Sequence, residues 1–175
     1  MRRHILATFA ATVTAAAAIV ITGTAGPAEA TTNLLALINY DNFQCADVYL
    51  GLPQDRAPVV SEPCAHYAEQ LWWVYLTSDG SGAFEFKNYL TDKCLATSSD
   101  GVGGVAIQTT CHGGTEQQWT YNGTPTYTLP VPGNTLYHFD NRRSGLCLQA
   151  AGVNGARLTM NYCGNRNDQY WWVVN

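Results

Sequence analysis

The sequence predicts an all-β domain made of three copies of one unit, each with four strands. Six cysteines fall into three pairs of similar spacing along the 175-residue chain. A Gln-x-Trp tripeptide follows the second cysteine of each pair at a constant distance. Beyond residue 30, short runs rich in Val, Thr, Tyr, Phe and Trp alternate with Gly, Asn, Asp and Pro, and apolar residues do not recur at helical spacing. Such recurrence indicates a unit of about 50 residues repeated three times.

The first 30 residues have the features of a secretory signal peptide. Two arginines precede an apolar run from Ile5 to Ile21, and the small-x-small site Ala28–Ala30 predicts cleavage before Thr31. The alternative, a membrane anchor, fits less well because the run is short and is followed at once by a cleavage site. We therefore expect a secreted, extracellular protein with a single domain over residues 31–175.

Charge and length exclude several classes of protein. The formal net charge is −4, and removal of the leader takes away two arginines and one glutamate. We expect no basic patch for nucleic acid or anionic lipid on a chain of this balance. The remaining length, about 145 residues, suits one domain with its own core.

The cysteines are expected to form disulfides. Export places them in an oxidising compartment, where an even number predicts bridges rather than thiolate catalysis or metal binding. Six cysteines allow fifteen pairings, and the repeat symmetry selects the one in which each unit closes on itself. Each bridge closes a short loop, which a chain-entropy model values at about 3 kcal/mol. The expected bridges are Cys45–Cys64, Cys94–Cys111 and Cys147–Cys163.

Four strands in each unit give an expected total of twelve. The units cover about residues 34–76, 83–122 and 135–175. In the middle unit, turn signals separate four runs, 83–88, 93–97, 105–110 and 117–121. An asparagine stands six residues before the first cysteine of each pair, at Asn39, Asn88 and Asn141. The irregular stretch Asn122–Asn134, with three prolines, is expected to link the second and third units.

The Gln-x-Trp motif is interpreted as architectural. A Gln and a Trp two residues apart on a strand point to the same face, which is expected to be the shared core. A buried indole contributes about 5 kcal/mol of gross hydrophobic free energy. The less favoured alternative is that these tryptophans are platforms for sugars. Trp73 and Trp172 alternate outward, and either cover a barrel end or stay exposed. The motif residues are Gln70, Trp72, Gln117, Trp119, Gln169 and Trp171.

Three Cys…Cys…Gln-x-Trp units, each introduced by Asn-x5-Cys, resemble the ricin B-chain type lectin module. The Cys-Leu pairs at Cys94 and Cys147 and the Cys-Ala-Asp-Val run from Cys45 to Val48 belong to the same pattern. The resemblance covers residues 34–175. It implies a β-trefoil, in which three four-stranded repeats surround a pseudo-threefold axis, and it implies carbohydrate binding.

The resemblance also places sugar-binding positions. Family members hold the sugar with an Asp two residues after the first cysteine, an aromatic residue two before the second, and a polar residue, often Asn, just before the motif Gln. The Asp position holds Asp47, Ala96 and Gln149 in the three repeats. The aromatic position holds Glu62, Thr109 and Asn161, and the position before the Gln holds Glu69, Glu116 and Asp168.

The first repeat therefore contains the best candidate pocket, because an ionised carboxylate accepts hydrogen bonds from two sugar hydroxyls. Tyr67 or Tyr49 is expected to replace the missing ring. The pocket residues are Asp47, Tyr67, Glu69 and Gln70. A weaker pocket in the third repeat consists of Gln149, Asn161, Tyr162 and Asp168, and the middle repeat is expected to be empty. The alternatives are that Asp47 accepts backbone N–H bonds in a turn and that the tyrosines pack on a neighbouring repeat.

We expect no catalysis, no cofactor and no metal site. The histidines do not recur at equivalent places, and Gly-x-Ser-x-Gly is absent. The leading hypothesis is a secreted, lectin-like module that binds a glycan or polysaccharide, with galactose-type sugars as the first to test. The alternative is an inhibitor-like scaffold that binds a protein partner through the loop Leu52–Pro58 or Thr124–Pro132. A third option is a structural protein that has lost sugar affinity.

Overall fold

Strands make up most of the regular structure in the residues that the computed structural model describes, 34–121 and 136–174. The predicted signal peptide and the predicted linker Asn122–Asn134 lie outside these residues, as does the loop Thr124–Pro132.

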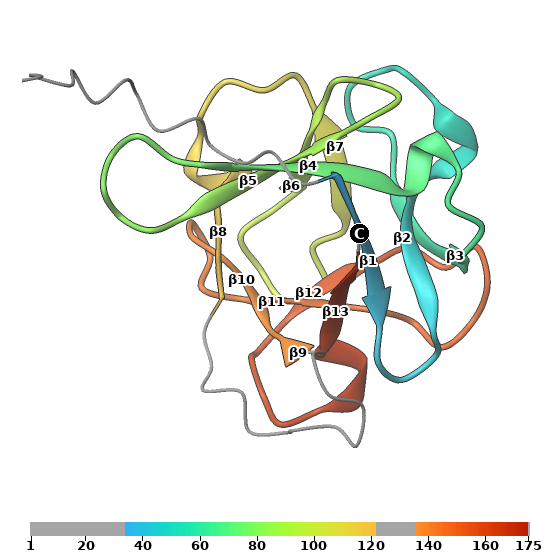
Figure 1. Ribbon diagram of the computed structural model, residues 1–175. Helices are drawn as coiled ribbons and strands as arrows, with labels where there is room; N and C mark the ends of the chain where they lie inside the picture. The colour runs from blue at the N-terminus through green and yellow to red at the C-terminus, as the bar shows by residue number, and fades with distance from the viewer. Residues whose placement is uncertain (1–33, 122–135, 175) are drawn as a thin grey trace, which may run out of the picture.

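Each unit contains four strand positions and a short 3-10 turn before its last strand (Figure 1). The first unit consists of β1 (Leu34–Asn39), β2 (Gln44–Val48), η1 (Tyr49–Gly51), β3 (Val59–Pro63), η2 (Ala68–Gln70) and β4 (Leu71–Leu76). The second consists of β5 (Phe84–Asn88), β6 (Cys94–Thr97), β7 (Ala106–Thr109), η3 (Thr115–Gln117) and β8 (Trp119–Tyr121). The third consists of β9 (Leu136–Tyr137), β10 (Phe139–Asn141), β11 (Cys147–Gln149), β12 (Thr159–Asn161), η4 (Asn167–Gln169) and β13 (Trp171–Val174).

The third unit differs from the expected four strands because its first strand is divided at His138. The part before His138, β9, pairs with β13, whereas the part after it, β10, pairs with β8 and β11. The chain thus changes partner at this residue, and the described residues contain thirteen strands instead of twelve.

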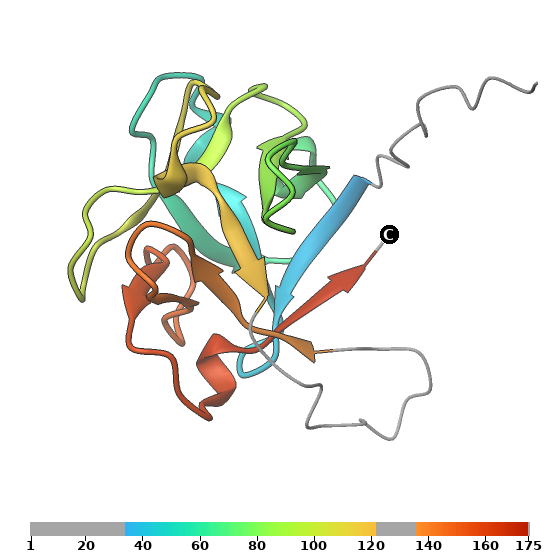
Figure 2. The same cartoon turned by 90° about the vertical axis from the view of Figure 1, so that its left-hand side faces the viewer.

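Antiparallel pairing closes the first and last strands of the units into a ring. β1 pairs with β4 and β13, β4 with β5, β5 with β8, and β8 with β10. Because β9 and β10 are successive parts of one strand and β9 pairs with β13, the ring returns to β1, which runs beside β13 (Figure 2).

The remaining strands form three hairpins, β2/β3, β6/β7 and β11/β12. Isolated bridges join each hairpin to the other two: Pro58 to Ile107, Val60 to Arg157, and Val105 to Thr159. A ring of strands with three linked hairpins is a β-trefoil, as the sequence predicts.

The motif tryptophans lie in the core, as expected. Trp72, Trp119 and Trp171 have no exposed surface. Each indole Nε1 donates a hydrogen bond to the carbonyl of the residue after the first cysteine of its own unit, at 3.0–3.1 Å. The indole is therefore both buried and satisfied, which removes the cost of burying its polar N–H. With no exposed surface, these rings do not form sugar platforms.

The motif glutamines are buried, but they do not share a strand with the tryptophans. Each ends a 3-10 turn, so the prediction of a common strand face is wrong for this residue. The side-chain Nε2 of each glutamine donates to the backbone carbonyl of the residue just before the second cysteine of its unit. The side-chain Oε1 accepts the backbone N–H of the residue just after that cysteine. The glutamine thereby fixes the backbone on both sides of the disulfide. The three glutamines are Gln70, Gln117 and Gln169.

A recurring asparagine fastens each unit to the unit before it. In each case Nδ2 donates to two carbonyls, those on either side of the preceding unit's motif glutamine. Asn88 reaches the first unit, Asn141 the second, and Asn39 reaches the third, which closes the cycle. All three have no exposed surface.

The three bridges form as predicted, Cys45–Cys64, Cys94–Cys111 and Cys147–Cys163, each with a Cα–Cα distance of 5.0 Å.

Trp73 and Trp172 are half-buried rather than fully exposed. The ring of Trp73 lies 6.0 Å from that of Tyr89, and the ring of Trp172 lies 5.4 Å from those of Tyr40 and Phe43. They therefore cover turns of neighbouring units.

Replacing Asn88 with alanine is expected to lower the free energy of unfolding by about 2–3 kcal/mol. The substitution removes the side-chain donor to the Glu69 carbonyl and one of the two donors to the Leu71 carbonyl, which also accepts a backbone N–H. Urea unfolding with the disulfides intact measures the change. Asn161→Ala is the matched control, since the Asn161 side chain accepts only the adjacent Tyr162 N–H. Equal losses in the two variants would contradict a special role for the recurring asparagine.

Candidate functional site

The four residues predicted for the first repeat line a single cavity of about 370 Å³, here called the first-repeat pocket. The pocket lies between η1, β2, β3 and η2. Its lining residues are Asp47, Tyr49, Leu50, Glu62, Pro63, Ala65, Tyr67, Glu69 and Gln70. The 3-10 turn η2 supplies the adjacent residues Glu69 and Gln70, and strand β2 supplies Asp47.

Asp47 is the most deeply placed carboxylate of the pocket, with 6% of its surface exposed. It lies within β2, opposite Val60 of β3, and Oδ2 accepts a hydrogen bond from Gln70 Nε2 at 3.0 Å. Among the described residues, Oδ1 has no hydrogen-bond partner. The alternative of a turn carboxylate bonded to backbone N–H groups is therefore wrong, and one oxygen is left for a ligand.

The pKa of Asp47 is raised to about 6. Burial is the main cause, because it disfavours the charged form, and the negative charges of Glu69 and Glu62 add to it. The hydrogen bond from Gln70 acts in the opposite direction and offsets part of this increase. At neutral pH Asp47 is therefore ionised, but at a cost in free energy.

Two tyrosines border the same pocket. Tyr67 is 62% exposed and Tyr49 is 39% exposed. The exposure of Tyr67 does not fit the alternative in which the tyrosines pack on a neighbouring repeat, whereas Tyr49 is more than half covered. Their rings offer the apolar surface that Glu62 cannot provide at the position where the family resemblance expects an aromatic residue.

In the third repeat, the structure brings together only part of the predicted set. Gln149 Nε2 donates to Asp168 Oδ2 at 2.9 Å, and Arg166 binds both oxygens of the same carboxylate at 3.1 and 2.8 Å. Gln149 Oε1 is buried without a partner among the described residues. Tyr162 is 75% exposed, and the Asn161 side chain accepts the Tyr162 N–H. Asp168 is thus already neutralised by an arginine.

The middle repeat, which was expected to be empty, contains a cavity of about 420 Å³ with a different lining. Ala96 offers no polar group where the first repeat has Asp47. Glu116 is paired with His112 at 3.1 Å and lies 3.7 Å from Arg143. Arg56 also lines the cavity, so residues of all three units meet there.

Sequence reasoning missed Arg56. The backbone N–H of Arg56 donates to the backbone carbonyl of the residue three positions before the second cysteine of the next unit. The backbone N–H groups of Gly103 and Gly155 make the equivalent bond in the other two units. All three have positive φ, at 70°, 83° and 73°, a conformation that favours glycine. An alignment of the repeats would have shown an arginine where the other two units have glycine.

The loop Leu52–Pro58, proposed as a protein-binding element, is fastened to the second unit. Gln108 Nε2 donates to the carbonyl of Leu52 at 2.6 Å. Asp55 forms an ion pair with Lys93 and accepts the N–H of Thr110. This loop therefore packs on the next unit, which gives no support to a freely protruding inhibitor loop.

The family model described as the ricin-type β-trefoil lectin domain matches residues 34–171. The chain belongs to this family. No curated protein matches the sequence. Domains of this family are typically carbohydrate-binding modules, and in some enzymes and toxins they form a separate part of the chain.

Solved structures share the trefoil at low sequence identity. The designed threefold-symmetric protein ThreeFoil is 22% identical, with a TM-score of 0.71, over 81% of this chain and 98% of its own. An exo-β-1,3-galactanase from Clostridium thermocellum is 23% identical, with a TM-score of 0.72, over 82% of this chain and 30% of its own. SeviL bound to asialo-GM1 saccharide is 18% identical, with a TM-score of 0.62, over 83% of this chain and 98% of its own. At these identities the likeness shows the fold.

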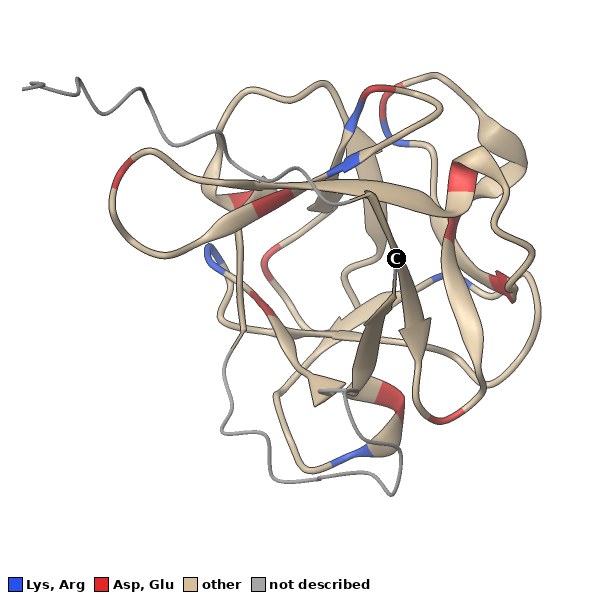
Figure 3. Ribbon diagram, in the orientation of Figure 1, with Lys and Arg blue, Asp and Glu red and all other residues tan. Residues whose placement is uncertain are grey.

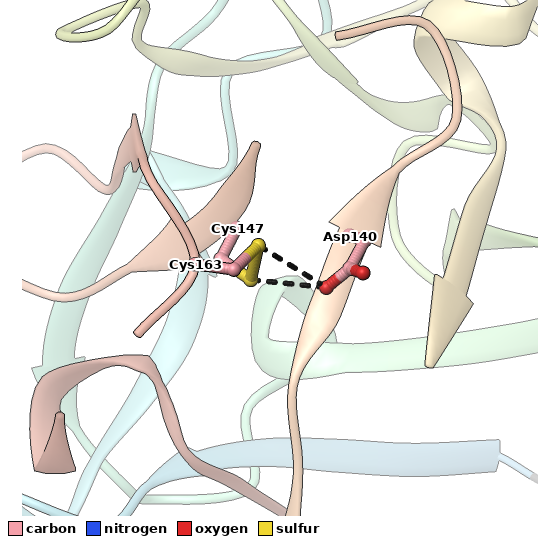
Figure 4. Close-up of side chains that lie close together, drawn as sticks. All are labelled: Asp140, Cys147 and Cys163. Atoms are coloured by element: carbon pink, nitrogen blue, oxygen red, sulfur yellow. Dashed lines mark hydrogen bonds between the residues drawn. A yellow bond between two sulfur atoms is a disulfide. The ribbon is translucent and has the colours of Figure 1, made fainter. Parts of the chain in front are cut away.

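Two further places in this lectin-family domain have a lining that does not suit a metal or a sugar. Asp140 Oδ1 lies 2.9 Å from Cys147 Sγ and 3.5 Å from Cys163 Sγ (Figure 4). These sulfurs are bonded to each other, so they provide no thiolate ligands for a metal. A second cavity of about 370 Å³ is lined by Leu, Val, Phe and Tyr side chains of the ring strands and has almost no polar surface with which to orient a sugar.

None of the helices in residues 34–121 and 136–174 has the length and apolar character needed to cross a bilayer.

The raised pKa of Asp47 predicts a stability difference that depends on pH. A folded-state pKa of about 6, above the usual 3.8 of an aspartate, means that the folded protein binds this proton more tightly than the unfolded chain. The resulting stabilisation is present at low pH and is lost as the pH rises towards 6 and above. Asp47→Asn should therefore be about 1–2 kcal/mol more stable than the unmodified protein at pH 7, and equally stable at about pH 4.

Thermal or urea unfolding of both proteins at the two pH values measures this difference. Asp41→Asn, on the exposed β1–β2 turn, is the control for a generic loss of negative charge. A constant difference between Asp47→Asn and the unmodified protein at both pH values would show that ionisation of Asp47 does not oppose folding.

Proposed function

We propose that this protein is a secreted, non-catalytic carbohydrate-binding module whose principal site is the first-repeat pocket. Membership of the ricin-type lectin family supports carbohydrate binding in general. The observation that carries the assignment of the site is Asp47, a carboxylate with one oxygen unpartnered within residues 34–121 and 136–174, in a cavity bordered by two exposed tyrosines.

The chemistry of sugar recognition fits this arrangement. Asp47 Oδ1 can accept a hydroxyl hydrogen bond, and such a charge-assisted bond contributes about 1.5–3 kcal/mol. Tyr67 or Tyr49 offers a face for the C–H side of the sugar ring. Gln70 is already bound to Asp47 and to backbone carbonyl and N–H groups, so its role is to hold the carboxylate in place.

The polar residues of the third repeat are assigned a secondary role. Gln149 Oε1 has no partner among the described residues but is buried, so a sugar hydroxyl would reach it only after a side-chain movement, and Asp168 is bound by Arg166. A shallow site with a few hydrogen bonds and one ring gives a dissociation constant of about 1 mM. Two such sites on one polymeric glycan would bind together more tightly than either alone.

The first test is binding to a glycan array and to immobilised lactose and galactose, with Asp47→Asn compared with Asp41→Asn. Loss of the charged acceptor is expected to weaken binding by about tenfold or more, whereas the exposed Asp41 lies outside the pocket and its replacement should have no effect. Equal retention of both variants, or no retention of the unmodified protein on any glycan, would rule out the proposed site.

Binding at this site is also expected to depend on pH. The sugar hydroxyls require the ionised carboxylate, and Asp47 takes up a proton below its pKa of about 6. The charged groups that face it are Glu62 on β3 and Glu69 on η2. Affinity should therefore be about tenfold weaker at pH 5 than at pH 7. Calorimetric titration measures this ratio, and Asp47→Asn should bind weakly at both values. A flat profile for the unmodified protein would exclude Asp47 as the acceptor.

A further inference from the structure

The first-repeat pocket has an unusual charge for a sugar site. Three carboxylates line it, those of Asp47, Glu62 and Glu69, and none of its lining residues is Lys, Arg or His. In Figure 3 the acidic segments of β2, β3 and η2 lie near one another on the right of the view. The cavity of the middle repeat, in contrast, is lined by two arginines and a histidine as well as two carboxylates. The excess of negative charge is therefore a property of the first-repeat pocket and not of the scaffold.

Two of the three carboxylates occupy positions where the family pattern expects another residue. Glu62 stands at the aromatic position and Glu69 at a position often held by Asn. Taken alone, these differences indicate a degraded site. The structure shows, however, that Tyr67 and Tyr49 border the same cavity, so an aromatic surface is still present while the charge has changed.

The three carboxylates are too widely spaced to hold a metal ion together. Among the described residues, the one group of three or more His, Cys, Asp or Glu ligand atoms within 4.8 Å of one another is Asp140 with Cys147 and Cys163. The pocket carboxylates are instead distributed around a cavity of about 370 Å³, which suits a ligand that presents several donors on a ring.

Asp47 marks the place where a donor is missing. Its side chain is more than nine-tenths buried, and Oδ1 has no hydrogen-bond partner among the described residues. The repulsion from Glu69 and Glu62 contributes to the raised pKa of Asp47, and a positive charge in the pocket would relieve that repulsion.

From this geometry we propose that the first-repeat pocket takes an amino sugar with a free, protonated amine, that is, a hexosamine that is not N-acetylated. This inference rests on the proposed function and names the class of sugar. The ammonium group forms charge-assisted hydrogen bonds with the pocket carboxylates, and the remaining hydroxyls and the ring face contact Asp47 and the tyrosines.

The test compares pairs of ligands that differ only in the amine. We would titrate the protein at about pH 7 with galactosamine against galactose, and with short glucosamine oligomers against N-acetylglucosamine oligomers of equal length. The amines should bind about three- to tenfold more tightly at low salt, and the advantage should shrink at high salt because exposed charges are screened. Free lysine at the same concentration should not compete.

Glu62→Gln and Glu69→Gln should each lower the ratio of amine affinity to neutral-sugar affinity, whatever their effect on the neutral sugar alone, because each removes one of the carboxylates that lines the pocket. Glu116→Gln is the matched control, because Glu116 holds the position of Glu69 in the middle repeat and lines a different cavity. Unchanged unfolding midpoints for these variants would show that the fold is intact.

The outcomes separate this inference from the proposed function. Equal affinity for amine and neutral sugar, with binding still lost in Asp47→Asn, would overturn the amino-sugar inference alone. No binding to any sugar would overturn both. Amine binding that survives Asp47→Asn and both Glu→Gln variants, or competition by lysine, would also overturn the inference, because the attraction would then be a general one between a cation and an acidic protein.

Discussion

A buried asparagine that fastens each unit to the one before it is the constraint on which the rest of the structure depends. Asn39, Asn88 and Asn141 each donate to the two carbonyls that flank a motif glutamine of the neighbouring unit. That glutamine holds the backbone on both sides of the second cysteine, and the tryptophan two residues later bonds to the residue after the first cysteine. Asparagine, glutamine, tryptophan and disulfide therefore act as one linked set that fixes the backbone of each unit.

With the backbone fixed in the same way three times, the exposed side chains determine what each repeat presents at its surface. The first repeat presents three carboxylates and two tyrosines, and the middle repeat presents a mixture of both charges. In the third repeat, Arg166 neutralises the carboxylate of Asp168. The same backbone thus supports three electrostatic environments, because rim residues contribute little to folding and can change without disturbing the core. A difference from the family pattern at the rim consequently indicates a change of ligand as readily as a loss of one.

Most of the fold could be predicted from the sequence, because repetition supplies three independent views of one unit. The disulfides, the buried tryptophans and the strand positions of the middle unit follow from spacing and alternation. The predictions that failed concern local geometry. The motif glutamines end 3-10 turns because their amides bridge the backbone around a cysteine, and the strand through His138 divides because it changes partners. Neither event leaves a periodic signal in the chain.

The sequence by itself determined the repeated unit, its internal bridges and the position of Asp47, since each depends on residues close together in the chain or on a pattern that recurs. Only the tertiary structure decided which side chains share a cavity and what charge that cavity has. In the folded protein the charge of Glu62 acts on Asp47, and Arg166 binds the carboxylate of Asp168. Arg56 of the first unit lines the cavity of the middle repeat. The reason is that electrostatic interactions and desolvation depend on distance and burial in space, and separation along the chain fixes neither.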